Sequence, residues 1–349
     1  MPRQDSRGSL FITYLKEKRP AIENYLYQRS PRPAQDTLKA EDLERYLYEP
    51  LSRFTAQGGK RVRPALVLLG CEAVGGDIRR SFSTAAAIEN FQSAALIHDD
   101  IADKSELRRG EPCVYVTEGT GIAINVGDLA LTTVFSDIVD DPVLSDSTKI
   151  HLLSELAQME QMTLEGQALD LGWVRDGRWD VSPEDYFEMA SHKTAYYSGA
   201  VPLAAGAICG QGNQKQIESL RNFGMKSGLA FQLQDDLLNL VGDASEQGKD
   251  YRSDITEGKR TLIAVWSLAH LDPDGRNELL SILKAHSSDA ALLNRAVKLM
   301  ERSGAIEHVH NEATRLISEA KDHLLAEQFA TSAYEMLLSM ADFFVGRAN

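Results

Sequence analysis

The stretch Leu96-Ile-His-Asp-Asp-Ile-Ala-Asp103 decides how the rest of the sequence is interpreted. If it ends a helix, Asp99 and Asp103 lie one turn apart on one face, with Asp100 beside them. Three carboxylates on one turn repel each other unless a cation or solvent takes up their charge. The basic pair Arg108-Arg109 follows at once. Because carboxylates suit magnesium and arginines suit phosphate, the stretch predicts a metal-bridged diphosphate site, although alone it also fits a solvated acidic helix end.

A second acidic turn further along the chain favours the diphosphate interpretation. The stretch Phe231-Gln-Leu-Gln-Asp-Asp-Leu-Leu-Asn239 places Asp235, Asp236 and Asn239 at one-turn spacing again. A basic segment, residues 248–260, follows it as the arginines follow the first turn. Two acidic turns that face each other can cage several metal ions, and a surface role explains such a repeat poorly.

A third motif, Gln57-Gly-Gly-Lys-Arg-Val-Arg-Pro64, precedes the first acidic turn. Its glycines let the backbone approach a ligand, and Lys60 and Arg63 can point at one anion from the start of the following helix. Taken alone, the motif is better explained as a surface loop that caps the apolar run after Pro64.

The composition is that of an ordinary globular protein, since 43% of the 349 residues are hydrophobic and 25% are charged. A formal net charge of −14 argues against nucleic acid or an anionic membrane as a standing partner. Three cysteines without metal spacing indicate a reduced setting. No secretory signal opens the chain, and the longest apolar run, residues 195–210, is shorter than the roughly 20 residues of a membrane span. We expect a cytoplasmic protein without a membrane span.

The spacing of apolar residues predicts helices along most of the chain. The sequence contains no run of alternating apolar and polar residues that would indicate a strand. Residues 1–40 are polar, and prolines near residue 31 predict an arm that ends in a turn. Helices are expected over residues 83–103, 121–139, 147–171, 183–198 and 201–210. Glycines break the pattern at residues 242–258, and helices resume at Thr261. The prediction is a single all-α domain over residues 1–349, with a C-terminal helical scaffold at 270–349.

At these motifs the sequence resembles the trans-isoprenyl diphosphate synthases. The resemblance rests on GGKRVRP, LIHDDIAD with RRGEP, GDLAL, HKTA, FQLQDD and GKDYRSDITEGKRTL, in the family's order between residues 57 and 264. It implies an isoprenoid-synthase-type bundle of long helices around a deep central cavity, usually as a homodimer. It also implies a Mg2+-dependent head-to-tail prenyltransferase that condenses isopentenyl diphosphate with an allylic prenyl diphosphate.

The resemblance further implies roles for individual residues. It implies that the principal magnesium ligands are Asp99, Asp103 and Asp235, supported by Asp100, Asp236 and Asn239. It implies that the clamp on the allylic diphosphate is Arg108, Lys193, Lys249 and Lys259. It implies that isopentenyl diphosphate is held by Lys60, Arg63, Gln92 and Arg109. Thr194 and Gln232 are similar to residues that steady the developing carbocation. Many family members have Asp at the position of Asn239, so we expect weaker metal binding there with activity kept.

The length of the product is expected to depend on the side chains below Asp99. Ala94 and Ala95 lie about one and a half turns earlier, where short-chain members of the family carry an aromatic floor, so the farnesyl stopping point is expected to be absent. Phe91 lies about one turn deeper and is expected to stop a longer chain. These residues predict geranylgeranyl diphosphate, with longer polyprenyl products as the nearer rival and farnesyl diphosphate as another.

Two further classes of protein share part of this pattern. A class I terpene cyclase also ionises a prenyl diphosphate at a DDxxD turn, but it needs no second diphosphate site, which GGKRxRP with Gln92 and Arg109 predicts here. A non-catalytic partner subunit is expected to lose acidic or clamp residues, and this chain keeps nearly all of them. The preferred allylic primer, the downstream pathway and any assembly beyond a dimer stay open.

Overall fold

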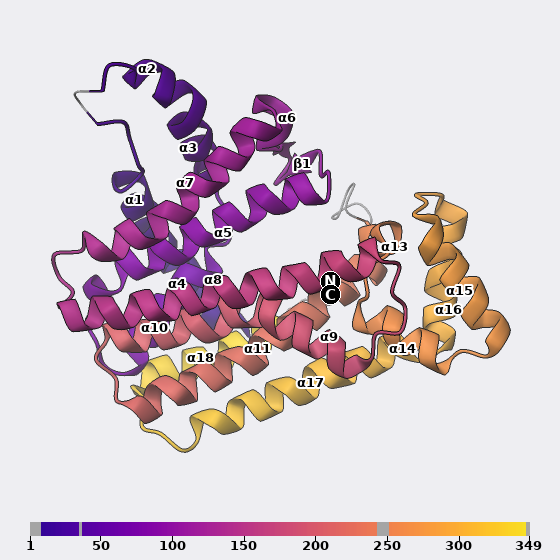
Figure 1. The fold of residues 1–349 in the computed structure, drawn as a ribbon. Coiled ribbons are helices and arrows are strands. Elements are labelled where there is room, and N and C mark those ends of the chain that lie inside the picture. Colours follow the sequence, from indigo (N-terminus) through magenta and orange to yellow (C-terminus); the bar gives the residue numbers. More distant parts are fainter. Residues whose placement is uncertain (1–7, 35–36, 243–250, 347–349) are drawn as a thin grey trace.

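The fold is known from a computed structural model, which describes residues 8–34, 37–242 and 251–346. Helices make up nearly all of its regular structure, as predicted, and the long ones lie roughly side by side (Figure 1). From the N-terminus to the first acidic turn the helices are α1 (Ser9–Gln28), α2 (Ala40–Leu43), η2 (Glu44–Tyr48), α3 (Glu49–Ala56), α4 (Val62–Ala73), η3 (Ile78–Arg80) and α5 (Phe82–Ala102). The next are α6 (Val114–Glu118), α7 (Thr120–Val139), α8 (Asp146–Arg175), α9 (Pro183–Ala190), the π-helical η4 (Ser191–Ala200), α10 (Val201–Cys209) and α11 (Gln214–Val241). The last are α13 (Ser253–Glu257), α14 (Leu262–His270), α15 (Pro273–Ala285), α16 (Ala290–Arg302), α17 (Ala305–Leu324) and α18 (Thr331–Val345).

Helix α10 lies at the centre of the bundle, and every one of its residues is buried. It packs against α4 on one side and α11 on another, and α11 in turn packs along α17 and η4. Helix α5 packs along α7, and α8 packs along η4. Because α5, α11 and η4 carry the predicted site residues, this packing brings the predicted motifs into one part of the molecule.

The N-terminal segment differs from the predicted polar arm. Its first part is helix α1, and the apolar side chains of Phe11, Tyr14, Leu15, Ile22 and Leu26 form a buried stripe on it. The backbone N–H of Phe11 donates to the Ser339 hydroxyl of α18 over 3.1 Å, so the first and last helices lie together. The helix ends at Gln28, just before the prolines that predicted a turn. The stripe was overlooked because the intervening residues are charged.

One helix of the described chain, α7, is long and apolar enough to cross a membrane. The buried core helix of a soluble protein passes the same test of length and composition. Within the bundle, 44% of its most apolar window is buried, mainly against α5. One such helix is therefore weak support for a membrane span.

Two short features were not predicted. Strands β1 (Leu107–Arg108) and β2 (Glu111–Pro112) pair as an antiparallel hairpin directly after the first acidic turn. The two-residue turn between the strands has positive φ at both positions, 56° at Arg109 and 84° at Gly110, as a type I′ turn requires. Helix α13 lies inside the predicted break at residues 242–258. Strands of two residues are too short for alternation to reveal them.

Candidate functional site

Helix α5 brings the first acidic turn to the end of the bundle and gives its carboxylates different partners. Asp99 accepts a hydrogen bond from the Gln167 amide of α8 over 2.7 Å. Asp100 is buried and accepts from Nε of Arg108 at 2.9 Å and from the second guanidinium nitrogen at 2.5 Å. Asp100 therefore holds an arginine in place, whereas Asp103 lies 4.0 Å from the Lys259 ammonium group.

The β1–β2 hairpin separates the two predicted arginines. Arg108 turns back to Asp100, whereas Arg109 donates to the carbonyl oxygen of Gly58 in the glycine-rich loop. The tight turn at Arg109 and Gly110 makes this divergence possible. The two neighbouring arginines thus contact different parts of the structure, the first acidic turn and the glycine-rich loop.

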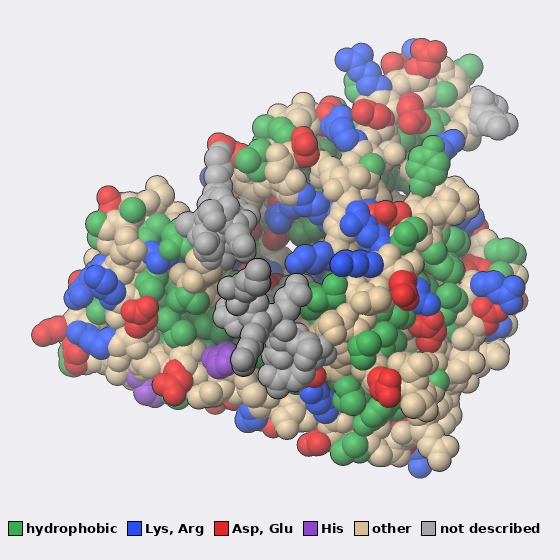
Figure 2. Space-filling view, turned by 180° about the vertical axis from the view of Figure 1, so that it is seen from behind, with side chains coloured by type: hydrophobic (Ala, Val, Ile, Leu, Met, Phe, Trp, Pro, Cys, Tyr) green, Lys and Arg blue, Asp and Glu red, His purple; other side chains and the backbone are tan. Residues whose placement is uncertain are grey.

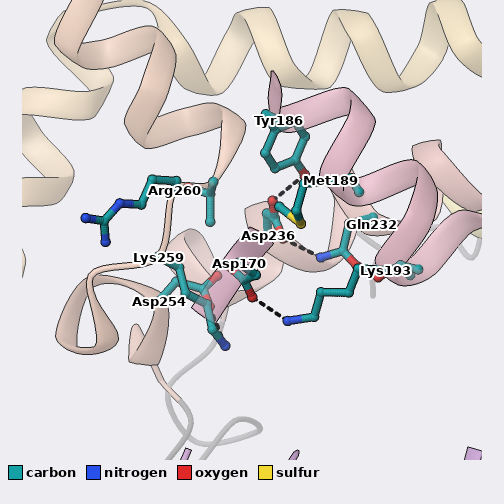
Figure 3. Close-up of a pocket in the computed structure, with 12 residues that line it drawn as sticks. Asp170, Tyr186, Met189, Lys193, Gln232, Asp236, Asp254, Lys259 and Arg260 are labelled. Atoms are coloured by element: carbon teal, nitrogen blue, oxygen red, sulfur yellow. Dashed lines mark hydrogen bonds and ion pairs between the residues drawn. The ribbon is translucent and has the colours of Figure 1, made fainter. Parts of the chain in front are cut away.

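The second acidic turn, on α11, is held by buried hydrogen bonds. The Tyr186 hydroxyl of α9 and the Gln232 amide each donate to Asp236 over 2.7 Å (Figure 3). Burial, and then the neighbouring Asp254, raise the pKa of Asp236. Both carboxylate oxygens of Asp236 have protein donors, so it acts chiefly as an anchor.

Asn239 also uses its side chain within the protein. Its amide nitrogen donates to the Ser253 hydroxyl over 3.1 Å, and its amide oxygen accepts from the backbone N–H of Asp254 over 3.2 Å. These bonds tie α11 to the first turn of α13. The amide that replaces a carboxylate here therefore orders the segment that leads to Lys259.

Two lysines lie between the acidic turns. Lys193 of η4 donates to Asp170 of α8 (Figure 3). The two backbones meet so closely that a Cβ on Gly166 of α8 would lie 2.2 Å from the backbone nitrogen of Lys193. Lys259 lies 2.7 Å from Glu257, 3.6 Å from Asp254 and 4.0 Å from Asp103. Burial alone would lower the pKa of Lys259, but these carboxylates raise it overall. Both lysines are therefore held charged, as diphosphate binding requires.

These groups surround a small cavity of about 70 Å³, which we call the acidic cavity. It is lined by Asp170, Tyr186, Met189, Ala190, Lys193, Thr194, Gln232, Asp236, Asp254, Lys259, Arg260 and Thr261. In Figure 3 the charged ends of Lys193 and Lys259 lie near Asp170 and Asp254, whereas the Arg260 guanidinium points away from Asp236. Arg260 donates instead to the carbonyl oxygens of Arg178 and Gly258, which steadies the loop before Lys259.

The donor set suits a divalent metal that shares its ligands with a substrate. Burial, and then the nearby Asp99, raise the pKa of Asp103 to about 6, and Lys259 only partly opposes that rise. Within the described ranges, no three His, Cys, Asp or Glu side chains are grouped to hold a metal alone. Magnesium commonly takes one or two carboxylates and completes its octahedron with water and phosphate oxygens. Of the predicted ligands, Asp100, Asp236 and Asn239 use their side chains within the protein, so Asp99, Asp103 and Asp235 stay the predicted magnesium ligands, with further oxygens from water and substrate.

A second cavity, of about 440 Å³, lies beside the glycine-rich loop, and we call it the cationic cavity. It is lined by Gln57, Gly59, Lys60, Arg61, Val62, Arg63, Glu89, Gln92, Arg109, Ser198, Phe231 and Phe344. Arg63 donates to the hydroxyls of Ser198 and Tyr197, each over 2.8 Å. On the face seen in Figure 2, Lys and Arg side chains gather around a hollow. All four residues predicted to hold isopentenyl diphosphate thus line one cavity.

A family model described as polyprenyl synthetase matches residues 44–300, which is most of the chain. The chain belongs to this family. The synthase is 40% identical over 293 residues to the short chain isoprenyl diphosphate synthase of Methanothermobacter thermautotrophicus, covering 84% of this chain and 87% of that protein. It is 32% identical over 335 residues to the geranylfarnesyl diphosphate synthase of Natronomonas pharaonis, covering 90% and 92%.

Solved structures agree with this assignment. The geranylgeranyl pyrophosphate synthetase of Pyrococcus horikoshii superposes with a TM-score of 0.86 at 32% identity, over 97% of the synthase and 98% of that chain. A geranylgeranyl pyrophosphate synthase of Corynebacterium glutamicum, complexed with isoprenyl diphosphate and magnesium, has a TM-score of 0.80 at 26% identity, over 99% of both chains. The protein is therefore a trans-prenyltransferase, an isoprenyl diphosphate synthase.

The synthase distributes the three predicted chain-length residues differently. Phe91 is buried, with its ring centroid 5.5 Å from that of Tyr197 in an edge-to-face contact. Ala94 is fully buried in an apolar cluster with residues of α3 and α7, such as Phe54 and Val126. Ala95 is only half-buried. A larger side chain at Ala94 would therefore disturb packing, and Ala95 is the better position for testing the floor.

Sequence reasoning missed several residues of the synthase site. Gln167 and Asp170 lie three residues apart on α8, and each contacts a predicted site residue. Tyr186 anchors Asp236, and Asp254 lines the acidic cavity. The i,i+3 spacing of Gln167 and Asp170 was a usable signal, whereas Tyr186 had none. The predicted Lys249 lies outside the described residues.

Proposed function

We propose that this synthase condenses isopentenyl diphosphate with an allylic diphosphate, with Mg2+ as cofactor, to make all-trans geranylgeranyl diphosphate. The single observation that carries the proposal is the pair of differently lined cavities that share η4. Lys193 and Thr194 line the acidic cavity, and Ser198 lines the cationic cavity. One short helix thus contributes to a site for a metal-bound diphosphate and to a site for a second diphosphate.

The allylic substrate belongs at the acidic cavity. Asp99, Asp103 and Asp235, which are not among the described lining residues of that cavity, would hold magnesium beside it. The metal when bound would offset the charge that gathers on the leaving diphosphate. Lys193 and Lys259 already lie between the acidic turns and would bind the diphosphate oxygens. Arg108, held by Asp100, adds a fixed positive charge at the rim of the site.

The carbocation and the second substrate meet next to these groups. The Gln232 amide N–H donates to Asp236, and its amide oxygen, which carries partial negative charge, would stabilise the developing positive charge. The Thr194 hydroxyl lies beside it in the cavity lining. Isopentenyl diphosphate, held in the cationic cavity, presents its alkene to the cation. The described lining residues include no histidine, and we propose that the released diphosphate takes up the proton.

The product length is the finer part of the proposal. The small side chain of the half-buried Ala95 stands where an aromatic floor would stop a farnesyl chain, and Phe91 lies about one turn further from Asp99 along α5. This depth supports four isoprene units. The relative from N. pharaonis is named for a five-unit product, so geranylfarnesyl diphosphate is the nearest alternative.

We also propose that the synthase forms a homodimer. Large apolar side chains are exposed along α7 and α8, at Ile124, Phe135, Val139, Ile150 and Leu164. Such side chains on neighbouring helices suit a second copy of the same surface. Sedimentation equilibrium at micromolar concentration should give twice the mass of the chain. A monomer would contradict the homodimer and would leave the proposed condensation reaction unaffected.

The deciding experiment is a product analysis. Purified protein, Mg2+ and labelled isopentenyl diphosphate are incubated separately with dimethylallyl, geranyl and farnesyl diphosphates, and the products are hydrolysed and sized. A dominant four-unit alcohol is expected. Longer alcohols would keep the condensation and refute the chain length. Release of hydrocarbon without elongation would indicate a cyclase, and complete inertness would indicate a subunit that needs a partner.

A further inference from the structure

The cationic cavity contains a buried ion pair that no predicted role explains. Arg61 is 5% exposed and Glu89 of α5 is 2% exposed. A guanidinium nitrogen of Arg61 donates to Oε1 of Glu89 over 2.5 Å, and another donates to the carbonyl oxygen of Thr55 over 2.6 Å. The side chain of Arg61 therefore ties the glycine-rich loop both to α3 and to the helix that carries the first acidic turn.

The backbone of Arg61 is strained at this point. It has φ 49° and ψ 38°, the left-handed conformation, and it directly precedes helix α4. A non-glycine residue adopts this conformation at a cost, and such strain persists where side-chain contacts hold it. Because Lys60 and Arg63 flank this residue, the strained turn sets the directions in which both cations leave the backbone. The contacts of the Arg61 guanidinium with Glu89 and Thr55 fix that turn.

The charge of Glu89 is out of place for direct substrate binding. Of the described residues that line the cationic cavity, four are Lys or Arg, and Glu89 alone carries a carboxylate. A carboxylate repels a diphosphate, so Glu89 weakens binding unless it does something else. Its Oε2 atom is buried and has no hydrogen-bond partner among the described residues, and its Oε1 atom is paired with Arg61, while Arg109 feels its charge from further away. Glu89 also lies three residues before Gln92, on the same side of α5.

We propose that Glu89 is a positioning residue for the second diphosphate, acting through Arg61. In the buried pair, Glu89 neutralises the charge of Arg61, and Arg61 holds the glycine-rich loop in place. Lys60, Arg63 and Arg109 are then left to contact the diphosphate. The inference deepens the proposed function and rests on it, because it assigns the cationic cavity to isopentenyl diphosphate. It predicts that damage to the pair affects one substrate and spares the other.

The test compares Glu89→Gln with a matched control. Glu89→Gln keeps the shape and an acceptor oxygen for Arg61 but removes the charge. Glu72→Gln makes the same charge change in a hydrogen-bonded glutamate of α4, which binds Tyr14 and Lys18 and lines neither cavity. Steady-state kinetics with Mg2+ are measured while each substrate is varied in turn. For Glu89→Gln the KM for isopentenyl diphosphate should rise about tenfold, while the KM for farnesyl diphosphate and kcat stay within about twofold. Glu72→Gln should change neither KM.

A double-mutant cycle shows whether Glu89 acts through Arg61. The KM for isopentenyl diphosphate of the double variant, Arg61→Gln with Glu89→Gln, should equal that of Arg61→Gln alone. Once Arg61 is replaced, the ion pair is already lost, so the change at Glu89 removes no further interaction. Independent, multiplying effects would overturn the proposal. So would an unchanged KM for isopentenyl diphosphate in Glu89→Gln, or a loss of kcat alone in proportion to lost folded protein. If the unmodified enzyme forms no condensation product, the proposed function fails instead, and the two failures are distinguished.

Discussion

Replacing Asp137 by Asn should stabilise the protein at alkaline pH and not at acid pH. Asp137 lies on α7, is 2% exposed, and accepts a hydrogen bond from the Asn90 amide over 2.8 Å. Among the described residues it pairs with one cation, Arg29, at 3.9 Å, whose side chain is 36% exposed. Burial raises the pKa of Asp137 from 3.8 to about 7, and Asn90 and Arg29 only partly oppose that rise.

The sign of the effect follows from proton binding. The folded state holds the Asp137 proton more tightly than the unfolded state, so the contribution of this group to stability is full below pH 4 and is lost as pH rises through 7. Taken in full, the difference in pKa is worth about 4 kcal/mol. Water and Arg29 can relax around the charge, so we expect about 2 kcal/mol, which for a chain of this size raises Tm by about 3 °C. Asparagine keeps the shape and removes the charge that causes the loss.

The assay is thermal unfolding of the unmodified protein and of Asp137→Asn at pH 4.5 and pH 8. The Tm difference should be small at pH 4.5 and should grow to its full size at pH 8. Asp140→Asn, which removes the same charge from an exposed neighbour, is the control and should show no such growth. An equal gain at both pH values, or a loss at pH 8, would refute the reasoning that burial controls this carboxyl.

Three further outcomes follow from the site. Ala95→Phe should shift the products toward farnesyl diphosphate in the sizing assay, whereas Ala94→Phe should lower Tm through overpacking; the same shortening by both would contradict their different burial. Tyr186→Phe removes the 2.7 Å hydrogen bond to Asp236 and should cost about 1–3 kcal/mol of unfolding free energy in a denaturant titration, and an unchanged midpoint would show that the bond is not formed. Lys259→Met should raise the KM for the allylic diphosphate at least tenfold and that for isopentenyl diphosphate much less, and equal effects would remove Lys259 from the allylic site.

Local patterns in the sequence predicted most of the helices. Helices α5, α7, α8 and α10 were expected within a few residues of their observed bounds, because their sequences are rich in apolar residues at helical spacing. Helix α1 was missed because a narrow apolar stripe among charged residues looks polar on average. The β1–β2 hairpin was missed because two residues per strand carry no period.

The roles of neighbouring residues required the tertiary structure. The sequence placed Arg108 and Arg109 side by side, and only the hairpin sends one to Asp100 and the other to Gly58. Asn239 looked like a weakened metal ligand, yet its amide binds Ser253 and the backbone of Asp254. Partners so far apart along the chain cannot be read from spacing within one helix.

What the sequence determined by itself is the chemistry available: two acidic turns, a glycine-rich basic loop and the family that carries them in this order. These are local properties, because one helical turn or one loop is enough to bring their groups together. Only the tertiary structure decided that Lys259 lies between Asp103 and Asp254, and that Glu89 is paired with Arg61 beneath the loop. Those contacts join helices that are distant in sequence, and their geometry depends on how the whole core packs.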